Sequence, residues 1–237
     1  MTLPDGDRTV VTMHIWGVPT AAIASATMAM ALDRRPLRNY PGLTFAKLLG
    51  TGLGRTFTVR DADPRHWATL CCWSTPEAAE RFEDSEVVRR WDARSEERAR
   101  IVMRPLTSRG SWSRKTPFGA PTPQRWDGRI AAITRARIKT RLWPTFWRAV
   151  PPVSADLRQR DGLQVALGIG EAPVGLQGTF SLWRDSHALR DFVYRGEPHQ
   201  RVMARTAEVG WYAEELFARL AVLSADGDYR RQSIATL

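Results

Sequence analysis

Short apolar runs and amphipathic segments alternate along the first half of the chain. Residues 10–18 (VVTMHIWGV) form an apolar run rich in β-branched residues, which predicts a strand. A helix is expected over residues 20–35, which begin with Thr20 and continue with Ala and Met. A helical region is also expected over residues 76–98, with Pro76 in its first turn. Further strands are predicted over residues 43–49, 67–73 and 99–106.

The second half of the chain repeats this order. Residues 67–82 (WATLCCWSTPEAAERF) match residues 177–192 (QGTFSLWRDSHALRDF). Each segment is a strand that ends in tryptophan, then a turn, then a helical stretch that ends in phenylalanine. Trp73 therefore corresponds to Trp183, and Phe82 to Phe192. The other second-half predictions are strands over residues 129–138, 163–170, 176–183 and 214–223 and helical segments over residues 142–160 and 186–209.

Strand–helix–strand–strand–helix–strand, present twice, is the pattern of a ferredoxin-like domain. Each copy covers one sheet face with its two helices and leaves the other face bare, so the two bare faces are expected to cover each other. We predict an α+β fold: tandem ferredoxin-like repeats forming an intrachain dimeric α+β barrel. The first half spans residues 8–107, a linker rich in Pro, Gly and Ser spans residues 108–128, and the second half spans residues 129–226.

Composition and charge narrow the class of protein. Hydrophobic residues make up 43% of the chain, which is enough for a packed core. No run of 18 apolar residues and no signal-peptide layout is present, so we expect a cytoplasmic protein and leave contact with a membrane surface open. The net charge of +10 favours anionic ligands, but no nucleic-acid motif accompanies it, so no nucleic-acid partner is expected.

The two cysteines, Cys71 and Cys72, are adjacent in a predicted strand and therefore point to opposite faces. They cannot crosslink distant segments, which fits a reducing compartment. Two small core residues are the favoured interpretation, ahead of a thiolate metal ligand.

No phosphate loop or nucleophile elbow is present, so the candidate chemistry rests on single histidines. The glycine-rich residues 50–55 lead into another strand-like run, which favours a tight turn over a dinucleotide site. His14 is expected to be a structural histidine in a strand. His66 is expected to be solvated in a polar loop. His187 is expected to be exposed or capping at a helix start.

His199 differs from these because it follows Pro198 at a predicted helix start. The positive end of the helix dipole disfavours imidazolium there, and a neutral imidazole is the form that a metal ion binds. Val202, Met203 and Thr206 share its helix face, so His199 is expected to point to the packed side. From the spacing alone, a core histidine and a ligand are equally good interpretations.

Several longer stretches carry a family resemblance. They are PGLTFAKLLGTG (41–52), SRGSWS with PF (108–118), ITRARI (133–138), FWRAVPPVS (146–154), GIGEAP with GTFSLW (168–183) and PHQRVMARTAEVGWYAEELFARLAVL (198–223). With these stretches the chain resembles the spheroidene monooxygenase family, enzymes that introduce keto groups into acyclic carotenoids. The resemblance covers the chain from about residue 10 to residue 224.

The resemblance implies a haem-dependent oxygenase with a b-type haem. It implies that His199 is the axial ligand of the iron, in a cavity between the two halves. The haem propionates would need cationic partners, and the candidates are Arg135, Lys47 and Arg137.

The strand over residues 176–183 is the candidate wall of a substrate pocket. Strand alternation places Gln177, Thr179, Ser181 and Trp183 on one side and Phe180 and Leu182 on the other. A polar stripe beside aromatic residues suits an apolar cavity with a few orienting groups, although Thr179 and Ser181 could equally well pair across the sheet. Glu214 and Glu215 would orient a ligand or support His199, and a pair of carboxylates in a solvated turn is an equally good interpretation.

The leading hypothesis is a haem-dependent monooxygenase that oxidises a hydrophobic, carotenoid-like or natural-product molecule with O2. An external electron donor such as a ferredoxin would supply the electrons, since no flavin, nicotinamide or iron–sulfur motif is present. One alternative is a haem enzyme for dehydration or peroxide chemistry, because a fold does not determine its chemistry. The other is a non-enzymatic haem- or lipid-binding module. A homo-oligomer is left open.

Overall fold

The computed structural model describes residues 9–53, 61–139, 141, 156–171, 178–195 and 209–235. The first half contains β1 (Val10–Gly17), a short 3-10 turn (Thr20–Ala22), α1 (Ile23–Leu32), α2 (Arg34–Arg38), β2 (Leu43–Gly52), β3 (Ala62–Trp73), α3 (Pro76–Glu83), α4 (Glu86–Asp92) and β4 (Glu97–Gly110). The second half contains β5 (Ile130–Ile138), β6 (Leu163–Gly170), β7 (Gly178–Trp183), α6 (Ser186–Arg195), β8 (Tyr212–Tyr229) and β9 (Gln232–Ser233). Among the described residues, no helix is both long enough and apolar enough to cross a membrane.

The predicted order of elements is confirmed wherever the structure describes it. The strands extend further than their apolar runs indicated: β3 begins at Ala62, and β4 runs from Glu97 to Gly110, into the segment predicted as linker. These extensions are mostly charged and polar, and their backbones pair with neighbouring strands. Backbone hydrogen bonds, rather than side-chain burial, therefore set the true ends of these strands.

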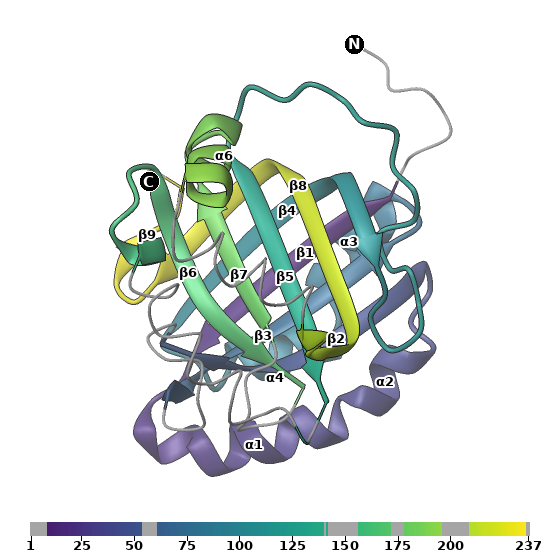
Figure 1. The fold of residues 1–237 in the computed structure, drawn as a ribbon. Helices are drawn as coiled ribbons and strands as arrows, with labels where there is room; N and C mark the ends of the chain where they lie inside the picture. Colours follow the sequence, from purple (N-terminus) through teal and green to yellow (C-terminus); the bar gives the residue numbers. More distant parts are fainter. Residues whose placement is uncertain are drawn as a thin grey trace.

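All strand pairs are antiparallel, and the two halves join into one continuous sheet. The first half has the strand order β4–β1–β3–β2, and the second half has the order β6–β7–β5–β8. β2 pairs with β6 at one junction, and β4 pairs with β8 at the other, so the strands close into a ring (Figure 1). The predicted fold class, an α+β fold with two ferredoxin-like repeats in one chain, is confirmed.

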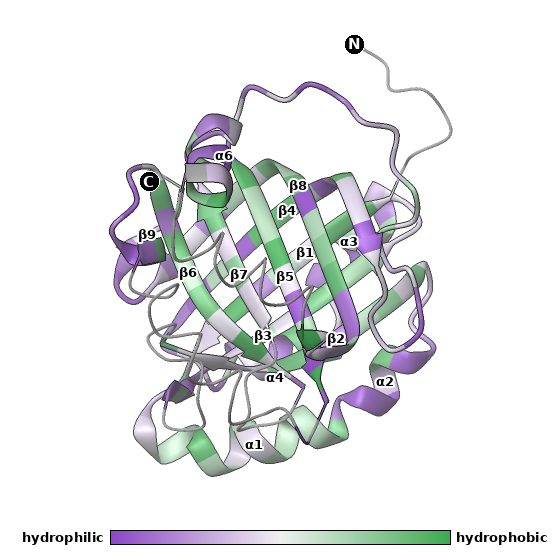
Figure 2. Cartoon of the chain, viewed as in Figure 1, coloured by the Kyte–Doolittle hydropathy of each residue, from purple (hydrophilic) through white to green (hydrophobic). Residues whose placement is uncertain are grey.

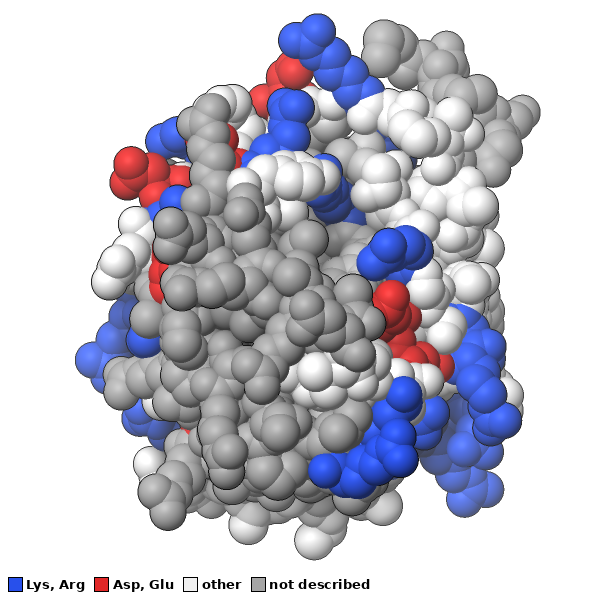
Figure 3. Space-filling model, in the orientation of Figure 1, with Lys and Arg blue, Asp and Glu red and all other residues white. Residues whose placement is uncertain are grey.

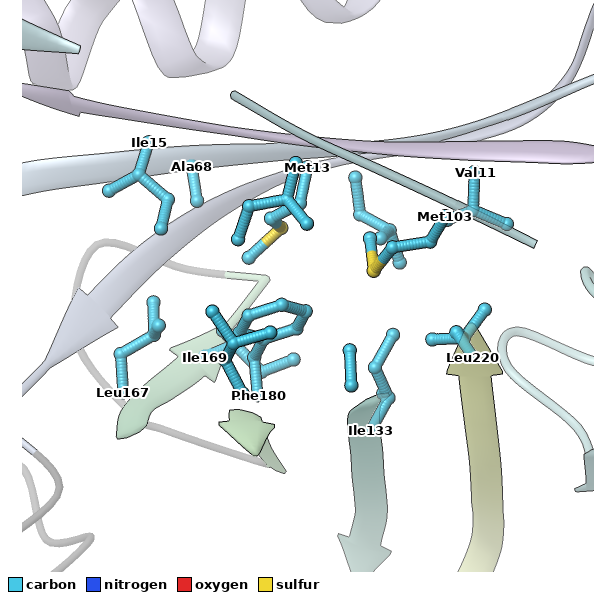
Figure 4. Packing of buried hydrophobic residues seen from close by; sticks show 14 of the residues in the cluster. Val11, Met13, Ile15, Ala68, Met103, Ile133, Leu167, Ile169, Phe180 and Leu220 are labelled. Carbon is cyan, nitrogen blue, oxygen red and sulfur yellow. The ribbon is translucent and has the colours of Figure 1, made fainter. Parts of the chain in front are cut away.

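The inner faces of the two half-sheets enclose the central core. Met13 and Ile15 of β1 face Leu167 and Phe180 of β6 and β7, and all four side chains are buried (Figure 4). Packed side chains fill this space, so the described residues leave no cavity for a large cofactor between the two inner faces. The location of a cofactor stays a prediction.

The two repeats match in detail at the end of their third strands. Trp73 packs on Phe82 with ring centroids 5.0 Å apart, and Trp183 packs on Phe192 at 5.4 Å. Side chains of Thr75 and Asp185 cap the helices that follow, accepting hydrogen bonds from the backbone N–H groups of Ala78 and Ala188. The repeat read from the sequence is therefore a structural repeat.

Helices α1 to α4 cover the outer face of the first half-sheet. A second core forms between them, in which Trp16, Trp67, Trp73 and Trp91 are all at most 2% exposed. Cys71 lies in this outer core and Cys72 in the central core, so the predicted division of the two cysteines between opposite faces is confirmed. Burial raises the pKa of both thiols, as expected for inert core residues.

Two matching hairpins close the ends of the ring. One is the turn 112–115 after β4, and the other is the turn 229–232 after β8. Ser113 and Arg114 have positive φ angles of 55° and 59°, and Arg230 and Arg231 have angles of 54° and 61°. Each turn presents backbone N–H groups to a glutamate of the other half. Glu214 accepts a hydrogen bond from Arg114 N, and Glu97 accepts them from Arg230 N and Arg231 N.

His14 and His187 lie as predicted. His14 is fully buried, stacks on Trp16 with centroids 5.2 Å apart, and bonds Glu83 at 2.8 Å. His187 is exposed on α6 and lies 3.3 Å from Asp191.

The prediction of a solvated His66 is wrong. This residue lies within β3, is 7% exposed, and has Asp63 at 2.8 Å and Glu97 at 2.6 Å from its two ring nitrogens. Burial alone would lower its pKa, but the hydrogen bonds to Asp63 and Glu97 outweigh burial and raise the pKa. His66 lines a pocket of about 640 Å³ at the end of the ring closed by the turn 229–232.

Candidate functional site

The outer faces of the two half-sheets differ in the size of their side chains. Equivalent positions follow from the pairing registers, because Val10 of β1 and Ile130 of β5 each face the tryptophan that ends the third strand. Leu43 of β2 and Leu163 of β6 face the same two tryptophans. The two outer faces can therefore be compared position by position.

In the first half, the outer face is filled by large side chains. His14 and Trp16 stack on it, and Trp91 of α4 stacks on Trp16 at 5.3 Å between centroids. Leu48 of β2 belongs to the same core and is 5% exposed. No room for a ligand remains between these described residues of the sheet and helices α1 to α4.

In the second half, the equivalent positions carry small side chains. Thr134 replaces His14, Ala136 replaces Trp16, and Gly168 replaces Leu48. We call this surface the small-residue floor; it consists of Ala132, Thr134, Ala136, Ala166, Gly168, Thr179 and Ser181. Ala132, Thr134, Ala166 and Thr179 remain partly exposed. The volume that indole and imidazole rings fill in the first half is thus left open by the floor residues of the second half.

Three of the four predicted pocket residues lie on this face of the sheet. The predicted alternation along β7 is confirmed, because Phe180 and Leu182 belong to the central core whereas Trp183 packs in a separate outer core with Phe192. Thr179 and Ser181 are floor residues, and Trp183 Nε1 donates a 2.9 Å hydrogen bond to Ser181 Oγ. Gln177 lies outside the described residues, and so does His199.

Lys47 and Arg135 are brought together on the inner side of the sheet, around two carboxylates. Lys47 Nζ lies 2.5 Å from Glu171 Oε2, and Arg135 Nη2 lies 3.1 Å from Glu171 Oε1. Arg135 Nη1 also pairs with Glu214. We call these four residues the Glu171 cluster. Binding of haem propionates by Lys47 and Arg135 stays a prediction. Both side chains already pair with carboxylates in this cluster.

Trp112 contacts two residues of the Glu171 cluster. Its indole N–H donates a 2.7 Å hydrogen bond to Glu171, and the Arg135 guanidinium lies 5.7 Å from its ring centroid. Burial would raise the pKa of Glu171, but the hydrogen bonds from Lys47 and Trp112 outweigh it and lower the pKa. Sequence reasoning missed Glu171 and Trp112 as partners, although both lie within the motifs GIGEAP and SRGSWS.

The two glutamates that begin β8 have different environments. The Glu214 side chain is 7% exposed, whereas the Glu215 side chain is 38% exposed and lies 3.7 Å from Arg109. Burial would raise the pKa of Glu214, but the Arg114 N–H and the Arg135 guanidinium outweigh it and lower the pKa to about 2. Glu214 therefore holds the Arg114 turn and Arg135 in place.

Replacing Glu214 with glutamine should lower the free energy of unfolding by about 3 kcal/mol, the cost of breaking a buried ion pair. The carboxylate contributes fully above its ordinary pKa of 4.5, and that contribution is lost as the pH falls toward about 2. E214Q should therefore lose less stability than the wild type between these pH values, as urea denaturation would measure. The matched control is Glu215→Gln, with an expected change below about 0.5 kcal/mol. Equal effects of the two substitutions would contradict the assignment.

Two further arginines lie near the floor strands. Arg137, near the end of β5, is exposed and faces Glu214 in the backbone register. Arg219 of β8 is the direct neighbour of Ala132. Because Ala218 and Leu220 belong to the central core, Arg219 lies on the opposite face, with the floor. Sequence reasoning did not select Arg219.

A haem requires a ligand for its iron and space for its ring. Among them, no three His, Cys, Asp or Glu side chains converge as a metal site, but a haem iron needs one axial ligand from the protein. A planar macrocycle needs space beside the strands, and the floor leaves more of it than the first half does, where Trp16 and Leu48 occupy the matching positions. The described residues therefore fit such a group on the outer face of the second half.

Comparison with known sequences shows close relatives. A spheroidene monooxygenase from Rhodobacter capsulatus is 33% identical over 216 residues, which cover 89% of this chain and 88% of the relative. A spheroidene monooxygenase from Rubrivivax gelatinosus is 34% identical over 197 residues, covering 82% of this chain and 75% of the relative. No family model matches the sequence.

Comparison with solved structures supports the fold. A crystal structure of an aldoxime dehydratase in complex with butyraldoxime has a TM-score of 0.61 and is 11% identical in sequence. The match covers 92% of this chain and 81% of the dehydratase. At this level of identity the similarity shows a shared fold and leaves the chemistry open.

Proposed function

Because this chain belongs to the spheroidene monooxygenase family, we propose that it is a haem-dependent monooxygenase acting on an elongated apolar molecule of the carotenoid kind. One oxygen atom of O2 would enter the substrate and the other would leave as water. The two electrons that this requires would come from an external donor such as a ferredoxin. Family membership supports the monooxygenase activity, and the haem is our extension of it.

The small-residue floor is the observation that carries the proposal. A duplicated fold needs helices over both outer faces, and the first half fills that interface with tryptophans. At three matched positions, His14, Trp16 and Leu48 of the first half are replaced by Thr134, Ala136 and Gly168 in the second. Loss of packing volume at several matched positions costs stability unless something else fills the space. A large planar cofactor with an apolar substrate beside it would fill it.

The chain's own residues would have distinct roles around the cofactor. His199 would hold the iron. When bound, a haem supplies the binding and activation of O2. The hydroxyl groups of Thr134, Thr179 and Ser181 would orient the few polar groups at the site, and Trp183 with Phe192 would close its apolar end.

Cations are needed for the two propionates. Lys47, Arg135 and Arg137 remain the proposed partners from the sequence. Arg219 is better placed than the Glu171 cluster, because it lies on the same face as the floor, whereas the cluster lies on the inner side of the same strands.

Turnover with isotopically labelled O2 tests the reaction class. Haem-loaded protein, a carotenoid substrate and a ferredoxin with its reductase should give a product that carries one labelled oxygen atom, measured by mass spectrometry. Omission of O2 or of the reductant should stop turnover, and boiled protein is the control. Turnover without O2 and reductant would instead identify the dehydratase type of chemistry and would contradict a monooxygenase.

A further inference from the structure

Helix α1 carries no charged residue, yet half of its ten residues are exposed to solvent. Only Ala26, Ala29 and Met30 are buried in the outer core of the first half. Met28 and Leu32, one turn apart on the same side, are each 64% exposed. The exposed residues of the helix, Ala24, Ser25, Met28, Ala31 and Leu32, include no charge. A helix without charged residues is normally buried against other protein or lipid, so we expect a binding partner for the exposed face of α1.

Helix α2 adds positive charge at one end of this face. Arg34, Arg35 and Arg38 are all exposed. The acidic residue between the two helices, Asp33, is turned inward, where it is 3% exposed and lies 2.6 Å from Arg90. α1 therefore carries pale and green residues while α2 is purple (Figure 2), and blue atoms gather over α2 at the lower right of the surface (Figure 3). Within helices α1 and α2, no exposed acidic residue balances these arginines.

A pocket of about 400 Å³ opens beside α2. Its wall carries Arg34, Arg38, Lys47 and Lys115, together with the hydroxyl group of Ser113. Lys47 is neutralised by Glu171, whereas Arg38 and Lys115 have no ion pair with the described residues. The charge that the pocket presents to solvent is thus positive, which suits a phosphate group at the edge of the apolar face.

We propose that α1 and α2 form a docking surface for an anionic lipid bilayer. The exposed face of α1 lies among the upper acyl chains, and Arg34, Arg35 and Arg38 lie at the level of the phosphates. A lipid surface is favoured because an uncharged exposed face lies beside three exposed arginines that no exposed acidic residue of these two helices balances. This inference does not rest on the proposed cofactor or reaction.

Vesicle flotation of the purified full chain tests the proposal. The wild type should float with vesicles of phosphatidylcholine mixed with phosphatidylglycerol, weakly with phosphatidylcholine alone, and less at high salt. Arg35→Gln with Arg38→Gln should weaken binding roughly 25-fold, at about fivefold for each arginine near the surface. Met28→Glu with Leu32→Glu should reduce binding to background.

Matched controls separate a docking surface from general effects of charge and fold. Leu223→Glu changes an exposed apolar residue on β8, and Arg125→Gln with Arg190→Gln removes two exposed arginines elsewhere. Both controls should float like the wild type, and all variants should keep the wild-type thermal midpoint. Equal loss in the controls, absence of wild-type binding, or a dimer that M28E/L32E dissolves would each overturn the proposal.

Discussion

Titration with haemin is expected to give the wild-type protein a Soret absorption band, and replacing His199 with alanine is expected to abolish this band. An axial ligand contributes a direct bond to the iron, so the loss of affinity should exceed the 10–100-fold that residues behind a ligand typically contribute, and should reach at least about 100-fold. The measurement is the absorbance titration of purified protein, with circular dichroism to verify folding. Oxygenation should fall in parallel.

Two comparisons make this result specific to the imidazole. His187→Ala removes an exposed histidine of α6, whose side chain is 72% exposed, and should bind haem like the wild type. Added imidazole should restore part of the Soret band to H199A, because it can occupy the vacated axial position. An unchanged Soret band in H199A would disprove the axial assignment, while loss of haem binding in H187A as well would point to a folding effect.

Filling the small-residue floor should remove the site and leave the fold intact. Thr134→Trp places an indole ring at the position where the first half carries the stacked His14. Thr134 is partly exposed, so the ring can be accommodated without entering the central core. Haem affinity should fall because the ring occupies the site, and oxygenation should fall by at least about 100-fold, since a displacement of about 1 Å at a reacting centre can already cost that much.

The controls for this variant test size and location separately. Thr134→Ser keeps the hydroxyl group and reduces the volume, and should stay within about threefold of the wild type, because no interaction is removed. Leu223→Trp places the same ring on an exposed position of β8, outside the floor. Full haem binding and activity in T134W would show that the cofactor lies elsewhere on the molecule.

The order of strands and helices could be predicted because it depends on local patterns. The apolar run of residues 10–18 and the tryptophan-ended strands are set by burial, which leaves a periodic trace in the sequence. The division of Cys71 and Cys72 between two cores follows from strand alternation alone. His66 could not be assigned in this way. Its partner Glu97 is 31 residues away, and its other partner, Asp63, is bonded by Arg230 near the far end of the chain.

The candidate site was only partly accessible from the sequence. Alternation along β7 correctly separated Thr179 and Ser181 from Phe180, and Lys47 and Arg135 were selected as basic residues near the sheet. The carboxylates that hold these two cations come from β8 and from the end of β6, and such pairing leaves no local pattern. The small-residue floor did leave a pattern in the sequence. Alignment of the two halves matches Ala136 to Trp16 and Gly168 to Leu48.

The two hairpins after β4 and β8 indicate how this chain evolved. Glu214 of the second half fastens the turn that follows the first half, and Glu97 of the first half fastens the turn that follows the second. Such an exchange of end pieces is what two identical subunits make across a twofold axis. The chain is therefore best regarded as a fused ancestral dimer. Both halves keep the tryptophan at the end of the third strand, but only the first half keeps Trp16 and Leu48 on its outer face, where the second carries Ala136 and Gly168.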